Sequence, residues 1–147
     1  MLYKTSFTAL FLTSLILCSD WRFQSDGPLS IKTQDNQTVR EYSDNVIIKN
    51  DRMTLYTDRA MQYTDSDEIL LEGNVKMVSD SDILECDRMY YWSVVDSAIA
   101  SGSVLLSNKQ QKIISDKITY KVMDGPFGFS FVSNGHTIIK DSLRTLS

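Results

Sequence analysis

Few side chains in the sequence have the types and spacing that catalysis or metal binding requires. His136 is the only histidine, and no cysteine lies at metal-ligand spacing from it. The aspartate pairs Asp65/Asp67 and Asp80/Asp82 fall in short polar segments typical of turns, whereas a catalytic carboxylate pair needs a cleft that raises one pKa. We therefore predict that the protein is not an enzyme and that it holds neither a metal ion nor a cofactor.

The composition is that of one globular domain without a nucleic-acid partner. The chain has 147 residues, of which 42% are hydrophobic and 23% charged, as in an ordinary folded domain. Its net charge is −4, its sequence pI is near 4.9, and Lys and Arg never form runs longer than two. A nucleic-acid-binding domain usually presents a basic face, so the charge argues against that class of protein.

Residues 1–20 have the pattern of an export segment. Lys4 precedes an apolar stretch over residues 5–17, which is the order of a secretory signal and is short for a transmembrane helix. Cys18 follows, as in a bacterial lipoprotein signal, and is a candidate lipidation site, although Leu17 departs from the small residue that such a signal has there. Cleavage, lipidation and retention as a membrane anchor remain open. We expect residues 21–28 to form a tether and residues 29–147 to form the folded domain.

The region that must position any site repeats itself every 29 residues. The first residues of the three copies are 29 positions apart, and each copy has an aspartate 14 residues after its first residue. These pairs are Asp44/Asp58, Gly73/Asp87 and Gly102/Asp116. A period of this size is typical of a stacked array in which no single unit buries its apolar face alone. Runs rich in Val, Ile, Tyr and Thr alternate with polar clusters, so each copy holds two strands joined by turns too short for parallel pairing. The sequence therefore predicts an all-β antiparallel meander.

The glycines and aspartates of the repeat predict a crease across this meander. Gly73 and Asp87 are equally distant from residue 80, which lies in a polar turn, and Gly102 and Asp116 are equally distant from residue 109. We expect the two residues of each pair to lie opposite one another in a hairpin. Glycine within a strand marks a bulge or a bend, and Asp bonds locally to backbone that leaves the ladder. A crease at one level through all the hairpins would fold the sheet into a V or a half-closed roll.

Side-chain alternation separates an apolar inner face of the roll from a polar outer face. Leu71, Gly73, Val75 and Met77 share one side of their strand, and this set is the more apolar one, so we assign it to the interior. The cations that follow the crease aspartates (Arg59, Arg88 and Lys117) are expected to point outward. Cys86 takes the place that Thr57 and Ser115 hold in the other copies, which indicates a small buried side chain and not a reactive thiol.

Two motifs of the repeat resemble those of a known family. Leu71-Glu72-Gly73-Asn74-Val75 is followed by Leu84-Glu85-Cys86-Asp87-Arg88-Met89-Tyr90-Tyr91. The pair recurs as Ala100-Ser101-Gly102-Ser103-Val104 and Ile113-Ile114-Ser115-Asp116-Lys117-Ile118-Thr119-Tyr120. Together with the export segment, they resemble the OstA-like, LptA/LptC family of periplasmic lipopolysaccharide-transport proteins. Asp44 stands where the later copies have glycine, which suggests a less sharply bent first hairpin.

The resemblance implies a twisted, half-open β-jellyroll whose apolar groove carries the acyl chains of lipopolysaccharide. It also implies a periplasmic protein, free or tethered to a membrane, that stacks on other jellyroll subunits through edge strands and bridges the inner and outer membranes. The groove residues that it implies are the inward apolar ones: Val46, Ile48, Leu55, Leu71, Val75, Met77, Leu84, Met89, Val104, Leu106, Ile113 and Ile118. Each buried methylene contributes about 0.8 kcal/mol, so such a lining could hold an acyl chain without any specific chemistry.

Three alternatives remain open at this point. The same apolar residues could pack only against each other, which would make the chain a structural β-repeat protein without a ligand. The chain could instead be a membrane-anchored or lipidated LptC-like component of the export complex. Finally, the sequence stops partway through a fourth copy that begins at Gly135, so either its last edge is open for docking or it is a fragment.

Overall fold

The computed structural model describes residues 21–80, 82–109, 111–122, 129–133 and 138–141. The export segment with Cys18, the histidine His136 and the glycine Gly135 that opens the fourth copy lie outside these residues. Among the residues that the structure describes, no helix is long and apolar enough to cross a membrane.

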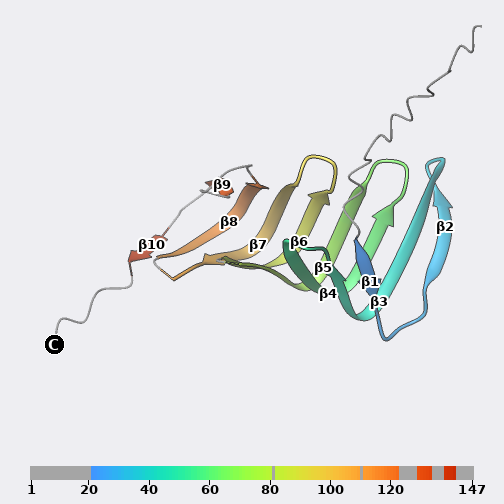
Figure 1. Cartoon of the computed structure of the whole chain (residues 1–147), viewed down its shortest axis with the longest axis horizontal. Coiled ribbons are helices and arrows are strands. Elements are labelled where there is room, and N and C mark those ends of the chain that lie inside the picture. The colour runs from blue at the N-terminus through green and yellow to red at the C-terminus, as the bar shows by residue number, and fades with distance from the viewer. Residues whose placement is uncertain (1–20, 81, 110, 123–128, 134–137, 142–147) are drawn as a thin grey trace, which may run out of the picture.

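Ten strands of the described residues form one antiparallel sheet. From β3 to β8 each strand pairs with the next one along the chain, whereas β1 and β2 both pair with β3, and β9 and β10 both pair with β8. The strands are β1 (Arg22–Gln24), β2 (Ser30–Gln34), β3 (Gln37–Lys49), β4 (Met53–Tyr63), β5 (Glu68–Ser79), β6 (Ile83–Trp92), β7 (Ser97–Ser107), β8 (Gln111–Val122), β9 (Phe129–Ser133) and β10 (Ile138–Asp141). They follow one another along the long axis of the molecule, from β2 at one end to β9 and β10 at the other (Figure 1). The all-β meander expected from the sequence is confirmed.

Each long strand crosses the molecule and changes register once on its way. The ladder shifts between Glu72 and Val75 where β5 pairs with β6, and at the equivalent place in every other pair of long strands. These shifts divide the sheet into two arms. The first arm contains residues 30–43, 59–72, 88–101, 117–122 and 129–133. The second contains residues 22–24, 46–57, 75–80, 82–86, 104–109, 111–115 and 138–141. The hairpin centres at residues 51, 80 and 109 agree with the pairing Ser43–Arg59, Glu72–Arg88 and Ser101–Lys117.

The inner faces of the two arms share one hydrophobic core. Leu71 and Met89 of the first arm belong to the same buried cluster as Val75 and Leu84 of the second. Leu71, Met89 and Leu84 are fully buried, and burying one such side chain stabilises the fold by roughly 1.5–3 kcal/mol. The interior is therefore the space between the arms, and the crease is the line along which they join.

Residues 21–28 are part of the domain, in contrast to the tether expected from their mixed composition. Arg22–Gln24 form β1, which pairs with the end of β3, and Trp21 and Phe23 pack against the core. The backbone N–H groups of Asp26 and Gly27 donate to the carbonyls of Asp44 and Ser43 at 2.8 and 2.9 Å. The segment folds in because its two aromatic rings bury apolar surface and its backbone completes the edge of β3.

Candidate functional site

The crease is built from pairs of residues in the left-handed backbone region. Gly73 has φ +85° and Asn74 +47°, and Gly102 and Ser103 repeat the pair at +78° and +48°. Two residues of the odd-numbered strand lie opposite one of the neighbouring strand, which is a β-bulge that bends the sheet. In the first copy, Asp44 (+64°) and its neighbour Asn45 form the same bulge without glycine, so the expected difference of the first hairpin is not seen in its backbone.

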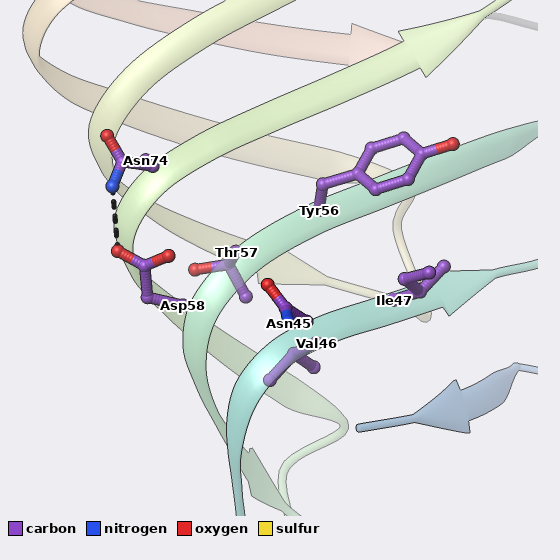
Figure 2. Close-up of a pocket in the computed structure, with 7 residues that line it drawn as sticks. All are labelled: Asn45, Val46, Ile47, Tyr56, Thr57, Asp58 and Asn74. Carbon is purple, nitrogen blue, oxygen red and sulfur yellow. Dashed lines mark hydrogen bonds between the residues drawn. The ribbon is translucent and has the colours of Figure 1, made fainter. Parts of the chain in front are cut away.

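An aspartate carboxylate lies against each crease glycine, but it comes from the preceding strand and not from the hairpin partner that the spacing of the repeat suggests. A Cβ atom on Gly73 would meet the Asp58 carboxylate at 2.6 Å, and one on Gly102 would meet the Asp87 carboxylate at 2.5 Å. Each glycine therefore contacts the aspartate of the preceding strand, not that of its own hairpin. The Asn74 side chain donates to the same Asp58 carboxylate at 2.8 Å, as Figure 2 shows. The glycines are needed both for their positive φ and for this close approach.

On the inner side of the crease, a small donor side chain occupies the same place in each copy. Thr57 donates its hydroxyl hydrogen to the carbonyl of Glu72 at 2.9 Å, and Ser115 donates to the carbonyl of Lys117 at 3.0 Å. Cys86 holds the equivalent place, with its sulfur 3.3 Å from the carbonyl of Arg88. Burial raises the pKa of the Cys86 thiol to about 12, which keeps it neutral and unreactive. These donors satisfy carbonyls that the bulge removes from the ladder.

A row of ion pairs runs along the outer side of the crease on the first arm. Glu41 pairs with Lys32 and with Arg59, and Glu72 connects Arg59 to Arg88 through contacts of 3.4 and 3.5 Å. Hydrogen bonds from Lys32 and Arg59 hold the pKa of Glu41 below its usual value. The outward direction expected for Arg59 and Arg88 agrees with their partly exposed side chains, and their role is to join neighbouring strands.

The twelve apolar residues predicted from the repeat all lie in the interior. None of them is more than 4% exposed. Eight of the twelve come from β3 to β7 of the second arm. The set as a whole is Val46, Ile48, Leu55, Leu71, Val75, Met77, Leu84, Met89, Val104, Leu106, Ile113 and Ile118. In this conformation their side chains pack against one another, so a ligand between the arms would have to replace some of these contacts.

The twelve predicted groove residues leave out an aromatic part of the interior on the first arm. Tyr91 and Tyr120 are fully buried in the same core, and Trp21 packs edge-on against the Tyr91 ring with centroids 5.2 Å apart. Burial raises the pKa of both tyrosines. A signal was present, because Tyr91 and Tyr120 follow the inward Met89 and Ile118 by two residues and therefore share their face.

A shallow hollow lies outside the first crossing of the crease. It has a volume of about 260 Å³ and is lined by Asn45, Val46, Ile47, Tyr56, Thr57, Asp58 and Asn74 (Figure 2). Several of its polar groups already serve the bulge, as the bond from Asn74 to Asp58 shows. Within the described ranges, no group of three or more His, Cys, Asp or Glu residues could hold a metal ion.

The geometry defines a class of protein. One antiparallel sheet is creased along a line, its two arms enclose an apolar interior, and polar side chains hold the crease from outside; this is a half-open β-jellyroll. The OstA-like protein family matches residues 23–147, and the chain belongs to this family, as the repeat motifs predict.

A solved structure shows a similar fold. The chain resembles LptH from Pseudomonas aeruginosa, described as the LptA homologous periplasmic component of the conserved lipopolysaccharide transport device. The two share 14% sequence identity with a TM-score of 0.56, and the match covers 78% of this chain and 94% of LptH. At this identity the likeness is one of fold. No curated protein matches the chain.

Proposed function

We propose that the protein binds the acyl chains of lipopolysaccharide between its two arms and passes them across the periplasm as one subunit of a bridge between the membranes. The observation that carries this proposal is the continuous apolar interior, to which both arms contribute along six successive long strands. Membership of the OstA-like family and the fold shared with LptH support it. In this function the chain performs no covalent chemistry; it shelters hydrocarbon from water, which is favourable by about 0.8 kcal/mol for each methylene.

Photo-crosslinking in cells tests the proposed binding surface. A photoreactive residue replaces Met77 or Leu106, which point into the interior, or Lys76, which neighbours Met77 and points outward. We expect a lipopolysaccharide adduct at the two inward positions and little or none at Lys76. Adducts at Lys76 with none at Met77 or Leu106 would exclude the interior as the binding surface.

The first edge of the sheet is the surface that we propose for stacking on another jellyroll subunit. All five residues of β2 are exposed, and Ile31 on this strand and Leu29 before it are 62% and 52% exposed. Among the described strands, β2 pairs on one side only, with β3, so its other side can extend the sheet of a neighbour by β-augmentation. Ile31→Pro would remove one backbone donor of β2, and we expect it to weaken concentration-dependent self-association or binding of a partner jellyroll in analytical ultracentrifugation, whereas Ile31→Val would not.

A further inference from the structure

The two arms are joined by backbone bonds at the crease and by side chains alone elsewhere. Among the described strands, only those that are neighbours in the sheet approach within 8 Å between Cα atoms. Every backbone ladder runs between such neighbours, and none runs from one arm to the other across the interior. The line where the free ends of the arms meet, which we name the seam, can therefore open without breaking a described backbone hydrogen bond.

An ion pair connects the two sides of the seam. Arg52 lies in the turn between β3 and β4, at the free end of the second arm, and Asp96 lies in the turn between β6 and β7, at the free end of the first arm. The Arg52 guanidinium is 3.3 Å from one Asp96 carboxylate oxygen, although the two residues are 44 positions apart in the chain. The Tyr91 hydroxyl donates to the other Asp96 oxygen at 2.6 Å, so this carboxylate joins the surface of the seam to the buried aromatic residues behind it.

Two further contacts cross the seam near this ion pair. Trp21, next to β1 of the second arm, packs edge-on against Tyr91 of the first arm. Ser79, which ends β5 on the second arm, interacts with the Tyr120 hydroxyl of the first arm. These contacts are few and lie at the margin, whereas the apolar side chains behind them are almost fully buried.

We propose that the seam is the gate through which an acyl chain reaches the interior, and that the Arg52–Asp96 ion pair is its latch. This inference rests on the proposed function, because a buried interior that accepts lipid needs a route inward. The arms separate more easily at the seam than at the crease, because backbone ladders, bulges and buried hydrogen-bond donors hold the crease together. Beside the latch, Val94 and Val95 are 75% and 56% exposed, which gives an arriving acyl chain an apolar surface at the mouth of the gate.

Distance measurements between spin labels test the latch without any lipid. The labels are placed at Lys49, an exposed residue next to the turn of Arg52, and at Val94, in the turn of Asp96, in a full-length background with Cys18→Ser and Cys86→Ser. Serine at position 86 is compatible with the fold because Ser115 holds the same place in the next copy. We expect one short distance population, and we expect Asp96→Arg to increase the population with longer distances about three- to tenfold, since it replaces attraction by repulsion at a partly exposed pair. The exchange Arg52→Asp with Asp96→Arg should restore the short population.

Two variants separate the latch from general damage. Asp96→Asn removes the charge but keeps an oxygen that can accept from Tyr91, so we expect an intermediate increase in long distances with an unchanged melting temperature. Asp51→Arg reverses a charge in the same turn as Arg52, where Asp51 pairs at 3.9 Å with Arg22 of its own arm. Because that pair does not cross the seam, Asp51→Arg should leave the distances unchanged. A distance distribution in Asp96→Arg identical to that of the parent would overturn the latch.

Uptake of a fluorescent fatty acid by the same variants tests the gate. We expect Asp96→Arg to bind the probe about three- to tenfold faster than the parent, and the charge exchange to return the rate to the parental value. If the parent binds the probe and the rate does not follow the distance populations, the seam is not the route and the gate is refuted. If no variant binds the probe even though the arms separate, the acyl-binding function itself is refuted, and the gate with it.

Discussion

Replacement of Gly102 measures how much the crease depends on its glycines. At φ +78°, Gly102→Ala forces an L side chain into the left-handed region at a cost of roughly 1–2 kcal/mol. The new Cβ would also lie 2.5 Å from the Asp87 carboxylate oxygen and 2.8 Å from the Asp87 Cβ, and overpacking of this kind typically costs about 1–3 kcal/mol. Reduced freedom of the unfolded chain returns about 0.4–1 kcal/mol. We therefore expect Gly102→Ala to lower the free energy of unfolding by about 2–4 kcal/mol.

A double-mutant cycle separates the two causes. Gly102→Asn keeps the contact with Asp87 and reduces the backbone cost, because Asn tolerates the left-handed region; we expect a loss of about 1–3 kcal/mol. In an Asp87→Gly background the contacting atoms are absent, so Gly102→Ala should cost only the backbone term less the same unfolded-state gain, a net loss of roughly 0–1.6 kcal/mol. Ser101→Ala, next to the bulge and outside the left-handed region, is the control and should change stability by less than about 1 kcal/mol.

Equilibrium unfolding in urea, followed by circular dichroism, gives these free energies for each variant. The decisive quantity is the coupling between positions 87 and 102. If Gly102→Ala costs the same with and without the Asp87 side chain, the carboxylate does not confine the glycine, and the explanation of the crease by close approach is wrong. The same cycle at Gly73 and Asp58 should agree, since a Cβ there would lie 2.6 Å from the carboxylate.

Three further predictions concern the core and the titratable groups. Leu84→Ala truncates a fully buried side chain and should lower the free energy of unfolding by about 2–5 kcal/mol, whereas Ile83→Ala, at an outward position 36% exposed, should lower it by less than about 1 kcal/mol; equal losses in urea would contradict the assignment of faces. The pKa of the Cys86 thiol is raised from 9.0 to about 12, so the buried neutral thiol contributes its full stability below pH 9 and this contribution is lost as the pH rises toward 12. Cys86→Ser should flatten the fall of the free energy of unfolding over this range, and native Cys86 should resist iodoacetamide at mildly alkaline pH until urea is added. The pKa of Glu41 is lowered from 4.5, chiefly by Lys32 and then by Arg59, so its contribution is present above pH 4.5 and is lost as the pH falls; Glu41→Gln should lower the melting temperature at pH 7 and have little effect in acid, and an equal effect at both pH values would show that the ion pairs do not act.

The repeat predicts the architecture well because two of its signals are local and redundant. Alternation of side chains assigns the faces, and the spacing of Gly73 and Asp87 about residue 80 predicts the hairpin register that Glu72 and Arg88 show. Three copies in phase make a one-residue slip improbable, since it would turn every apolar residue of a strand outward. The interior positions follow from the same pattern. The turn at residues 93–96 lacks a polar cluster, because Val94 and Val95 occupy its middle, so it follows from the repeat alone, 29 residues after the turn at residues 64–67.

What the repeat did not predict depends on contacts between copies. The partner of Gly102 is Asp87 and not Asp116, because the Asp87 carboxylate reaches across the ladder from the preceding strand. The spacing of the residues alone does not distinguish between these two aspartates. Arg52 and Asp96 belong to different copies and different arms, so only the way the arms face each other brings them together.

The uneven distribution of bonds between crease and seam determines how such a sheet can change shape. The crease is fixed by backbone ladders on both sides, by left-handed residue pairs and by buried donors, so bending it further would leave carbonyls without partners, at roughly 1–3 kcal/mol each. Opening the seam requires only the loss of side-chain contacts and of apolar packing between the arms. An acyl chain that enters as the arms separate restores apolar contact to the same side chains, which offsets the lost packing between the arms. The remaining cost of opening is then the loss of the contacts among Arg52, Asp96 and Tyr91 at the seam. In the proposed function, lipid therefore acts on the seam, while the crease keeps the spacing of the strands constant.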